Sequence, residues 1–208
     1  MKNSSIASLS AARTVLAALA LAAIGRQLLI HVGASYSALN FFSYFTNLSN
    51  LFAVVVLLAS VLVRSSPRSE TTDIARYVST VNMAIVGIVF SLLLRNVDLG
   101  ALLPWVNIVL HYVMPVAIVL DWLLQPPASV LKARHLALAL AFPAAYLVYT
   151  LLRGGATGWY PYPFLNPANV GGYGGVAAYA LGIFAAYLLA GSALLAAGNR
   201  LHRSRRHE

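Results

Sequence analysis

The sequence predicts an all-α polytopic membrane protein, a bundle of six transmembrane helices. Of its 208 residues, 60% are hydrophobic and only 9% are charged, and the mean hydropathy is +0.78. A helix that crosses the bilayer needs about 20 mostly apolar residues. Six stretches meet this requirement, near 12–31, 40–63, 76–95, 104–124, 134–152 and 173–197. Because the connections between them are short, we expect a single six-span membrane domain over residues 1–208 and no soluble module.

The first stretch also has features of a secretory signal peptide, since Lys2 and Arg13 accompany a run rich in alanine and leucine. The helical pattern runs on through Arg26, however, and five more spans follow. We therefore expect the first helix to be retained.

The second stretch begins with unusually polar sequence, Y-F-T-N-L-S-N over residues 44–50. A hydroxyl or amide buried without a partner costs roughly 2–7 kcal/mol, so a polar group at membrane depth is a candidate functional residue. The candidates are Ser43, Thr46, Asn47 and Asn50 here, and Asn82 in the third stretch. Helical spacing predicts that Ser43, Thr46 and Asn50 share one face.

The fourth stretch carries Asn107, His111 and, near its inner end, Asp121. At 1.5 Å per residue, Thr46 lies about 9 Å and His111 about 10 Å below the outer surface. Asn107 and His111 share a face, which can turn toward the polar face of the second helix. A hydroxyl and an imidazole at matched depth can act as nucleophile and base in acyl transfer.

Each of these residues also has a simpler interpretation. A threonine in a membrane helix usually bonds its own i−4 carbonyl, and histidine or asparagine often joins two helices. Asp121 is either an anchor at the inner interface beside Trp122 or part of a proton relay. A metal or haem site needs more ligands at one depth, and only His31 is available, so we expect no metal and no cofactor. The sequence has no cysteine, which excludes thiolate chemistry.

The segment 153–172 differs from the other connections, because it combines glycines, three prolines and four aromatic residues. We expect that it is not a regular helix. Since tryptophan and tyrosine favour the headgroup level, we expect an external cap over the bundle, with Tyr162 and Phe164 over the polar pocket. An ordinary interfacial loop is the alternative.

The net charge of +9 is distributed unevenly, which predicts the orientation in the membrane. With both termini cytoplasmic, eleven basic residues are internal and three are external. The internal ones are Lys2, Arg13, Arg64, Arg68, Arg76, Lys132, Arg134, Arg200, Arg203, Arg205 and Arg206, and the external ones are Arg26, Arg95 and Arg153. We expect a cell-membrane protein whose basic C-terminal tail, 200–208, contacts anionic lipid headgroups rather than nucleic acid.

Four features together resemble the androgen-induced six-span family of intramembrane threonine hydrolases. They are the six spans, Y-F-T-N-L-S-N-L at the start of the second (44–51), V-L-H-Y-V-M-P in the fourth (109–115) and Y-P-F-L before the sixth (162–165). Animal members of that family cut fatty acid esters of hydroxy fatty acids, and many bacterial relatives are uncharacterised. The resemblance extends from the first helix to the sixth. It implies that Thr46 is the nucleophile and His111 the catalytic histidine.

This resemblance implies an intramembrane hydrolase whose substrate is a lipid acyl ester. Ser43, Asn47, Asn50 and Asn107 would then hold the geometry or donate to the oxyanion. Arg26 and Arg95 either bind a substrate carboxylate or reach lipid phosphates. No carboxylate lies at that depth, which favours a dyad over a triad.

Two other functions compete with the hydrolase. In one, the same polar residues line a pocket or path for a small solute or ion. Such a path should extend polar groups through the inner half of the bundle, where we expect mainly Asn82 and Asp121. In the other, the protein is a purely structural membrane partner.

Overall fold

The computed structural model describes residues 3–62, 69–97 and 102–205, and every regular element among them is helical. The elements are α1 (Asn3–Gly33), α2 (Ala38–Phe42), α3 (Phe45–Leu62), α4 (Glu70–Val89), η2 (Phe90–Leu94), α5 (Pro104–Ile108), η3 (Val109–Val113), α6 (Met114–Leu124), α7 (Ala133–Thr157), η4 (Pro163–Leu165), η5 (Pro167–Asn169) and α8 (Tyr173–Ser204). Six helical runs in this part of the chain are long and apolar enough to span a membrane. The predicted all-α, six-span fold is confirmed.

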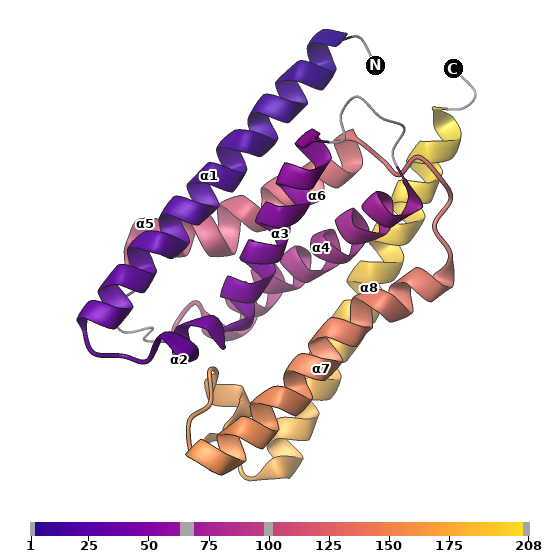
Figure 1. Ribbon diagram of the computed structural model, residues 1–208. Coiled ribbons are helices and arrows are strands. Elements are labelled where there is room, and N and C mark those ends of the chain that lie inside the picture. The colour runs from indigo at the N-terminus through magenta and orange to yellow at the C-terminus, as the bar shows by residue number, and fades with distance from the viewer. Residues whose placement is uncertain (1–2, 63–68, 98–101, 206–208) are drawn as a thin grey trace.

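Helix α4 is the centre of the bundle. It packs against α3, α6, α7 and α8, while α1 packs mainly against α3. The two chain ends lie at one end of the bundle, and α2 and the connection between α7 and α8 lie at the other (Figure 1). This placement follows from an even number of spans. We call the end that holds the termini the inner end, in keeping with the predicted orientation.

The second predicted span is not one continuous helix. It is interrupted at Ser43 and Tyr44, so that α2 and α3 are separate helices. Ser43 therefore does not share a helical face with Thr46, contrary to the prediction from their spacing. Most other helices extend beyond the predicted bounds; α4, for example, begins at Glu70, because Ser69 caps it by accepting a 3.2 Å hydrogen bond from the Thr72 amide.

The segment 153–172 begins as helix, which corrects the prediction for its first residues. Helix α7 continues to Thr157 and ends at Gly158, whose φ of 71° is readily adopted by glycine. Gly154 lies against the Tyr160 ring, where a Cβ atom would be only 2.0 Å from the ring. The remaining segment folds back as two 3₁₀ turns, η4 and η5.

Two π-helical turns, η2 and η3, lie within the third and fourth spans. Pro115 follows η3 directly in α6. A proline has no amide hydrogen, and its ring crowds the carbonyl four residues earlier, which here belongs to His111. Pro115 therefore accounts for the widened turn that contains His111.

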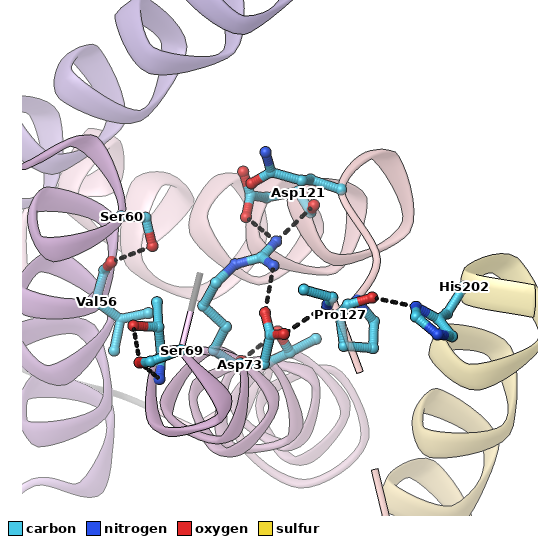
Figure 2. A network of polar contacts seen from close by, with 12 residues as sticks. Val56, Ser60, Ser69, Asp73, Asp121, Pro127 and His202 are labelled. Carbon is cyan, nitrogen blue, oxygen red and sulfur yellow. Dashed lines mark hydrogen bonds and ion pairs between the residues drawn. The ribbon is translucent and has the colours of Figure 1, made fainter. Parts of the chain in front are cut away.

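The inner end contains a buried network of charges that the sequence analysis did not anticipate. Asp121 accepts hydrogen bonds from Arg13 Nε at 2.7 Å and from Arg76 Nη2 at 2.9 Å. Asp73 lies 3.7 Å from Arg76 and accepts a 2.5 Å bond from the Ala128 amide. Figure 2 shows Asp73 and Asp121 on opposite sides of this network.

This network corrects three expectations. Asp121 is a buried partner of two arginines, not an anchor at the interface, and Trp122 beside it is fully buried, where its indole donates to the Leu194 carbonyl. Arg13 and Arg76 are buried, so they are not free cytoplasmic charges. The inner half of the bundle is therefore more polar than Asn82 and Asp121 alone suggested.

Candidate functional site

Thr46 and His111 lie together at the outer half of the bundle. The Thr46 hydroxyl is 3.3 Å from His111 Nε2, a hydrogen bond between α3 and η3. Both residues are 8% exposed. The structure thus contains the proximity that helical depth predicted, while a catalytic role for either residue stays a prediction.

The other ring nitrogen of His111 fixes its tautomer. Nδ1 lies 3.2 Å from the Asn107 backbone carbonyl, which can only accept, so Nδ1 carries the hydrogen. In the neutral ring, Nε2 is then an acceptor and faces the Thr46 hydroxyl. Phe90 of η2 stacks on the imidazole, with centroids 4.0 Å apart and an interplanar angle of 24°. The ring is thus held by a hydrogen bond at one edge and an aromatic face.

Tyr162 reaches the same point from the connection between α7 and α8. Its hydroxyl accepts a 3.3 Å hydrogen bond from the Thr46 backbone amide. Burial raises the pKa of Tyr162 to about 12, so the phenol is protonated at neutral pH. The ring stacks on Phe164, with centroids 5.3 Å apart. Tyr162 therefore contacts Thr46 directly and Phe164 contacts Tyr162, while a role of the two residues as a cap stays a prediction.

The predicted amide donors are largely engaged with backbone carbonyls. Asn47 Nδ2 donates to Phe41 at 2.8 Å, and Asn50 Nδ2 donates to the Thr46 and Leu110 carbonyls at 2.9 and 3.2 Å. These bonds hold α2, α3 and η3 together. A structural role fits both amides better than donation to an oxyanion.

Two further candidates have different surroundings from those expected. The Ser43 hydroxyl bonds the Leu39 carbonyl and the Tyr149 hydroxyl, both at 2.7 Å, and Ser43 lies outside the cavities at Thr46. The backbone carbonyl of Asn107 accepts the hydrogen bond from His111 Nδ1. The side-chain Oδ1 of Asn107 is buried with no hydrogen-bond partner.

Thr46 lies where two cavities meet. An apolar cavity of about 190 Å³ extends between α4, α7 and α8, and a more polar cavity of about 340 Å³ extends toward the outer end. Four residues line both, Thr46, Phe90, Leu94 and Tyr162. A group that reacts at Thr46 would therefore face an apolar cavity on one side and a more polar cavity on the other.

Arg26 and Arg95 are exposed, and neither lines these cavities. The structure does not bring them to Thr46. Arg153, the third basic residue predicted to be external, is held by other contacts. It donates to Asn40 Oδ1 at 2.5 Å, and its guanidinium carbon lies 4.6 Å from the centroid of the Trp159 ring. In the described part of the chain, no group of three or more His, Cys, Asp or Glu side chains is placed to hold a metal ion.

Comparison with known families agrees with the resemblance seen in the sequence. The family model for FAR-17a/AIG1-like protein matches residues 14–196. The chain belongs to the FAR-17a/AIG1-like family. No curated protein and no solved structure matches it. The match runs from within the first span to within the sixth and includes the residues around Thr46 and His111.

Sequence reasoning missed Phe90 and the inward direction of the Tyr162 hydroxyl. Phe90 is one apolar residue among many in its span, and nothing in its spacing marks it. A signal did exist for the turn around His111, since Pro115 follows it by four residues. Tyr162 was predicted as a cap, and its contact with Thr46 depends on how 158–172 folds back.

Proposed function

We propose that the protein is an intramembrane hydrolase of lipid acyl esters that uses Thr46 as nucleophile and His111 as base. The observation that carries this proposal is the 3.3 Å contact between the Thr46 hydroxyl and His111 Nε2 at the junction of the two cavities. Membership of the FAR-17a/AIG1-like family supports it.

Acylation follows from the tautomer of His111. As the Thr46 oxygen attacks the ester carbonyl carbon, its proton passes to Nε2. The tetrahedral intermediate then collapses, the ester C–O bond breaks, and the imidazolium gives the proton to the departing alcohol. The Asn107 carbonyl supports the transient positive charge on the ring, in the position that a carboxylate has in a triad.

Deacylation repeats these roles with water. A water molecule in the polar cavity gives a proton to Nε2 as its oxygen attacks the acyl–threonine carbonyl. Collapse of the second intermediate releases the fatty acid, and the proton returns to the Thr46 oxygen. The cavity of about 340 Å³ supplies the room for this water.

Tyr162 is the best placed donor for the oxyanion. Its oxygen accepts from the Thr46 amide, so the phenol lies beside Thr46 and its hydrogen can turn toward a carbonyl oxygen held there. The raised pKa keeps that hydrogen in place. This assignment replaces the amides of Asn47 and Asn50 as donors.

Covalent labelling tests the proposal. Purified protein should react with a fluorophosphonate probe at Thr46, and the adduct should be found on that residue by mass spectrometry. Thr46→Ala should abolish labelling and ester hydrolysis, while Thr46→Ser should retain some of both because the hydroxyl survives. Thr150→Ala is the matched control, since Thr150 is also buried but lines neither cavity.

Replacement of the base gives the second arm of the test. His111→Ala should lower kcat about 10²- to 10⁴-fold, because an unassisted threonine hydroxyl is a weak nucleophile. Full activity of either Thr46→Ala or His111→Ala would refute the hydrolase.

Transport of a small solute or ion is the competing function. The charged network lies toward the inner end of the bundle, away from the site. Asp121 is about 15 Å from His111 along the axis of the fourth span. Apolar side chains such as Met83, Met114 and Ile118 lie between them, together with buried polar side chains of α4 such as Ser79 and Asn82. None of the residues of the charged network lines either cavity at Thr46, which favours a pocket that opens outward over a path through the bundle.

Orientation and lipid contact belong to the same proposal. We place the protein in the cell membrane with both termini cytoplasmic. Without the buried Arg13 and Arg76, nine basic residues remain on the proposed inner side against three outside. In the tail, Arg200, Arg203 and Arg205 are exposed and can meet anionic headgroups, whereas His202 is buried and bonds the Pro127 carbonyl at 2.9 Å (Figure 2). Lys2, Arg64, Arg68 and residues 206–208 lie outside the described residues.

A further inference from the structure

The two cavities at Thr46 differ in chemistry, and this difference constrains the substrate. We infer that the apolar cavity binds the acyl chain of the ester and that the polar cavity binds a neutral polyol as the leaving alcohol, such as the glycerol of a neutral lipid. This inference rests on the proposed hydrolase. It predicts that an ester whose alcohol part carries a carboxylate is a poorer substrate.

The apolar cavity matches a hydrocarbon chain. Its lining includes Ile85, Val86 and Val89 of α4, Leu140 and Leu147 of α7, and Ile183 and Phe184 of α8. Two of its phenols are engaged elsewhere, since Tyr146 donates to the Ser43 carbonyl at 2.8 Å and Tyr187 to Asn82 Oδ1 at 3.1 Å. The chain would therefore meet almost only carbon, which favours burial of an alkyl group.

The extent of this cavity indicates a medium-length chain. Its lining on α4 and η2 runs from Ile85 to Leu94, which is about 13 Å along the helix axis. Ala144 of α7 and Phe184 of α8 line it and are exposed, so the cavity opens between these two helices. In a membrane that opening faces lipid, and an acyl chain can enter sideways.

The polar cavity offers hydrogen bonds, but none of the described residues that line it is a lysine or an arginine. Its polar lining residues are Gln27, His31, Tyr44, Thr46, Asn47, His111, Tyr160, Tyr162, Asn166 and Asn169. Arg26 and Arg95 are exposed elsewhere. A carboxylate in this cavity would lose water without gaining a cation, whereas hydroxyl groups can exchange hydrogen bonds with amides.

The substrate test uses two esters with the same acyl chain and different alcohols. The full chain in lipid nanodiscs is given monooctanoylglycerol or the octanoyl ester of hydroxystearic acid. We expect kcat/KM to be at least about tenfold higher for the glycerol ester, because the cavity must desolvate the carboxylate of the other. A preference for the hydroxystearate ester would overturn the inference.

Two pairs of variants test each cavity separately. Ala144→Trp should narrow the apolar cavity and raise the ratio of butyryl to octanoyl ester hydrolysis about tenfold, while Ala145→Trp, at an exposed neighbour outside the lining, should not. Asn169→Arg should add a cation to the rim of the polar cavity and raise hydrolysis of the hydroxystearate ester relative to the glycerol ester about tenfold. Ala168→Arg is its exposed control outside the lining.

The outcomes distinguish this inference from the proposed function. If Thr46 is labelled and both esters are cut, but neither variant shifts the ratios, the hydrolase stands and the cavity assignment is wrong. If no ester is cut and Thr46 is not labelled, both fail. The expected shifts with Thr46-dependent turnover would support both.

Discussion

The Tyr162 hydroxyl is bonded to the backbone amide of Thr46, a residue 116 positions earlier in the chain. This bond brings the connection between α7 and α8 onto the start of α3, at the residue we propose as nucleophile. The proposed cap therefore contacts the proposed nucleophile directly. Its contribution can be separated from that of the dyad by substitution.

Tyr162→Phe should lower kcat about 10²-fold with little change in KM, because the phenylalanine keeps the ring and loses only the proposed oxyanion donor. The measurement is steady-state hydrolysis together with thermal unfolding. Tyr149→Phe is the control, since Tyr149 bonds Ser43 and lines neither cavity at Thr46. A purely structural Tyr162 would instead lower the unfolding temperature and leave kcat of the remaining folded protein unchanged.

The relation of Thr46 to His111 was predictable from sequence because it depends on local geometry. Counting 1.5 Å per residue along a continuous second and fourth span places both residues at one depth, and the structure has them in contact even though the second span is interrupted at Ser43 and Tyr44. The six spans were predictable for a similar reason, since each depends on the composition of one continuous stretch.

The features that were missed depend on folding between distant segments. Arg13 and Asp121 are 108 residues apart, and their pairing removes from solution a charge that the sequence suggested was cytoplasmic. The break at Ser43 is stabilised by Tyr146, which donates to the Ser43 carbonyl from α7. Neither partner is marked by local periodicity.

The buried charge network should be important for stability and not for chemistry. Asp121→Asn leaves Arg13 and Arg76 buried with one countercharge fewer, and we expect a loss of about 3–5 kcal/mol in the free energy of unfolding. Thermal unfolding in a mild detergent measures it. Glu70→Gln breaks the exposed pair with Arg134 and should cost less than about 1 kcal/mol. Equal effects of the two substitutions would contradict a structural role for the network.

The proposed orientation predicts where reporter proteins are active. A reporter that works only in the cytoplasm should be active when fused after residue 208, and one that works only outside should be active when inserted in the segment 166–169. This follows from the excess of basic residues at the end that holds both termini. External activity of the C-terminal fusion would invert the topology and place the Thr46 site on the inner side.

The fold of the cap predicts a difference between two adjacent glycines. Gly154 lies against the Tyr160 ring, so the Cβ of Gly154→Ala would be 2.0 Å from that ring and must displace it. Tyr160 lines the polar cavity, and its displacement should disturb the neighbouring Tyr162 and lower kcat/KM about tenfold. Overpacking should also cost about 1–3 kcal/mol of stability. Gly155→Ala is the matched control, because nothing lies within 4 Å of a Cβ there and an exposed helical position favours alanine. If the two variants have the same kcat/KM and the same unfolding temperature, the connection does not depend on the close contact between α7 and Tyr160, and the cap does not control the site.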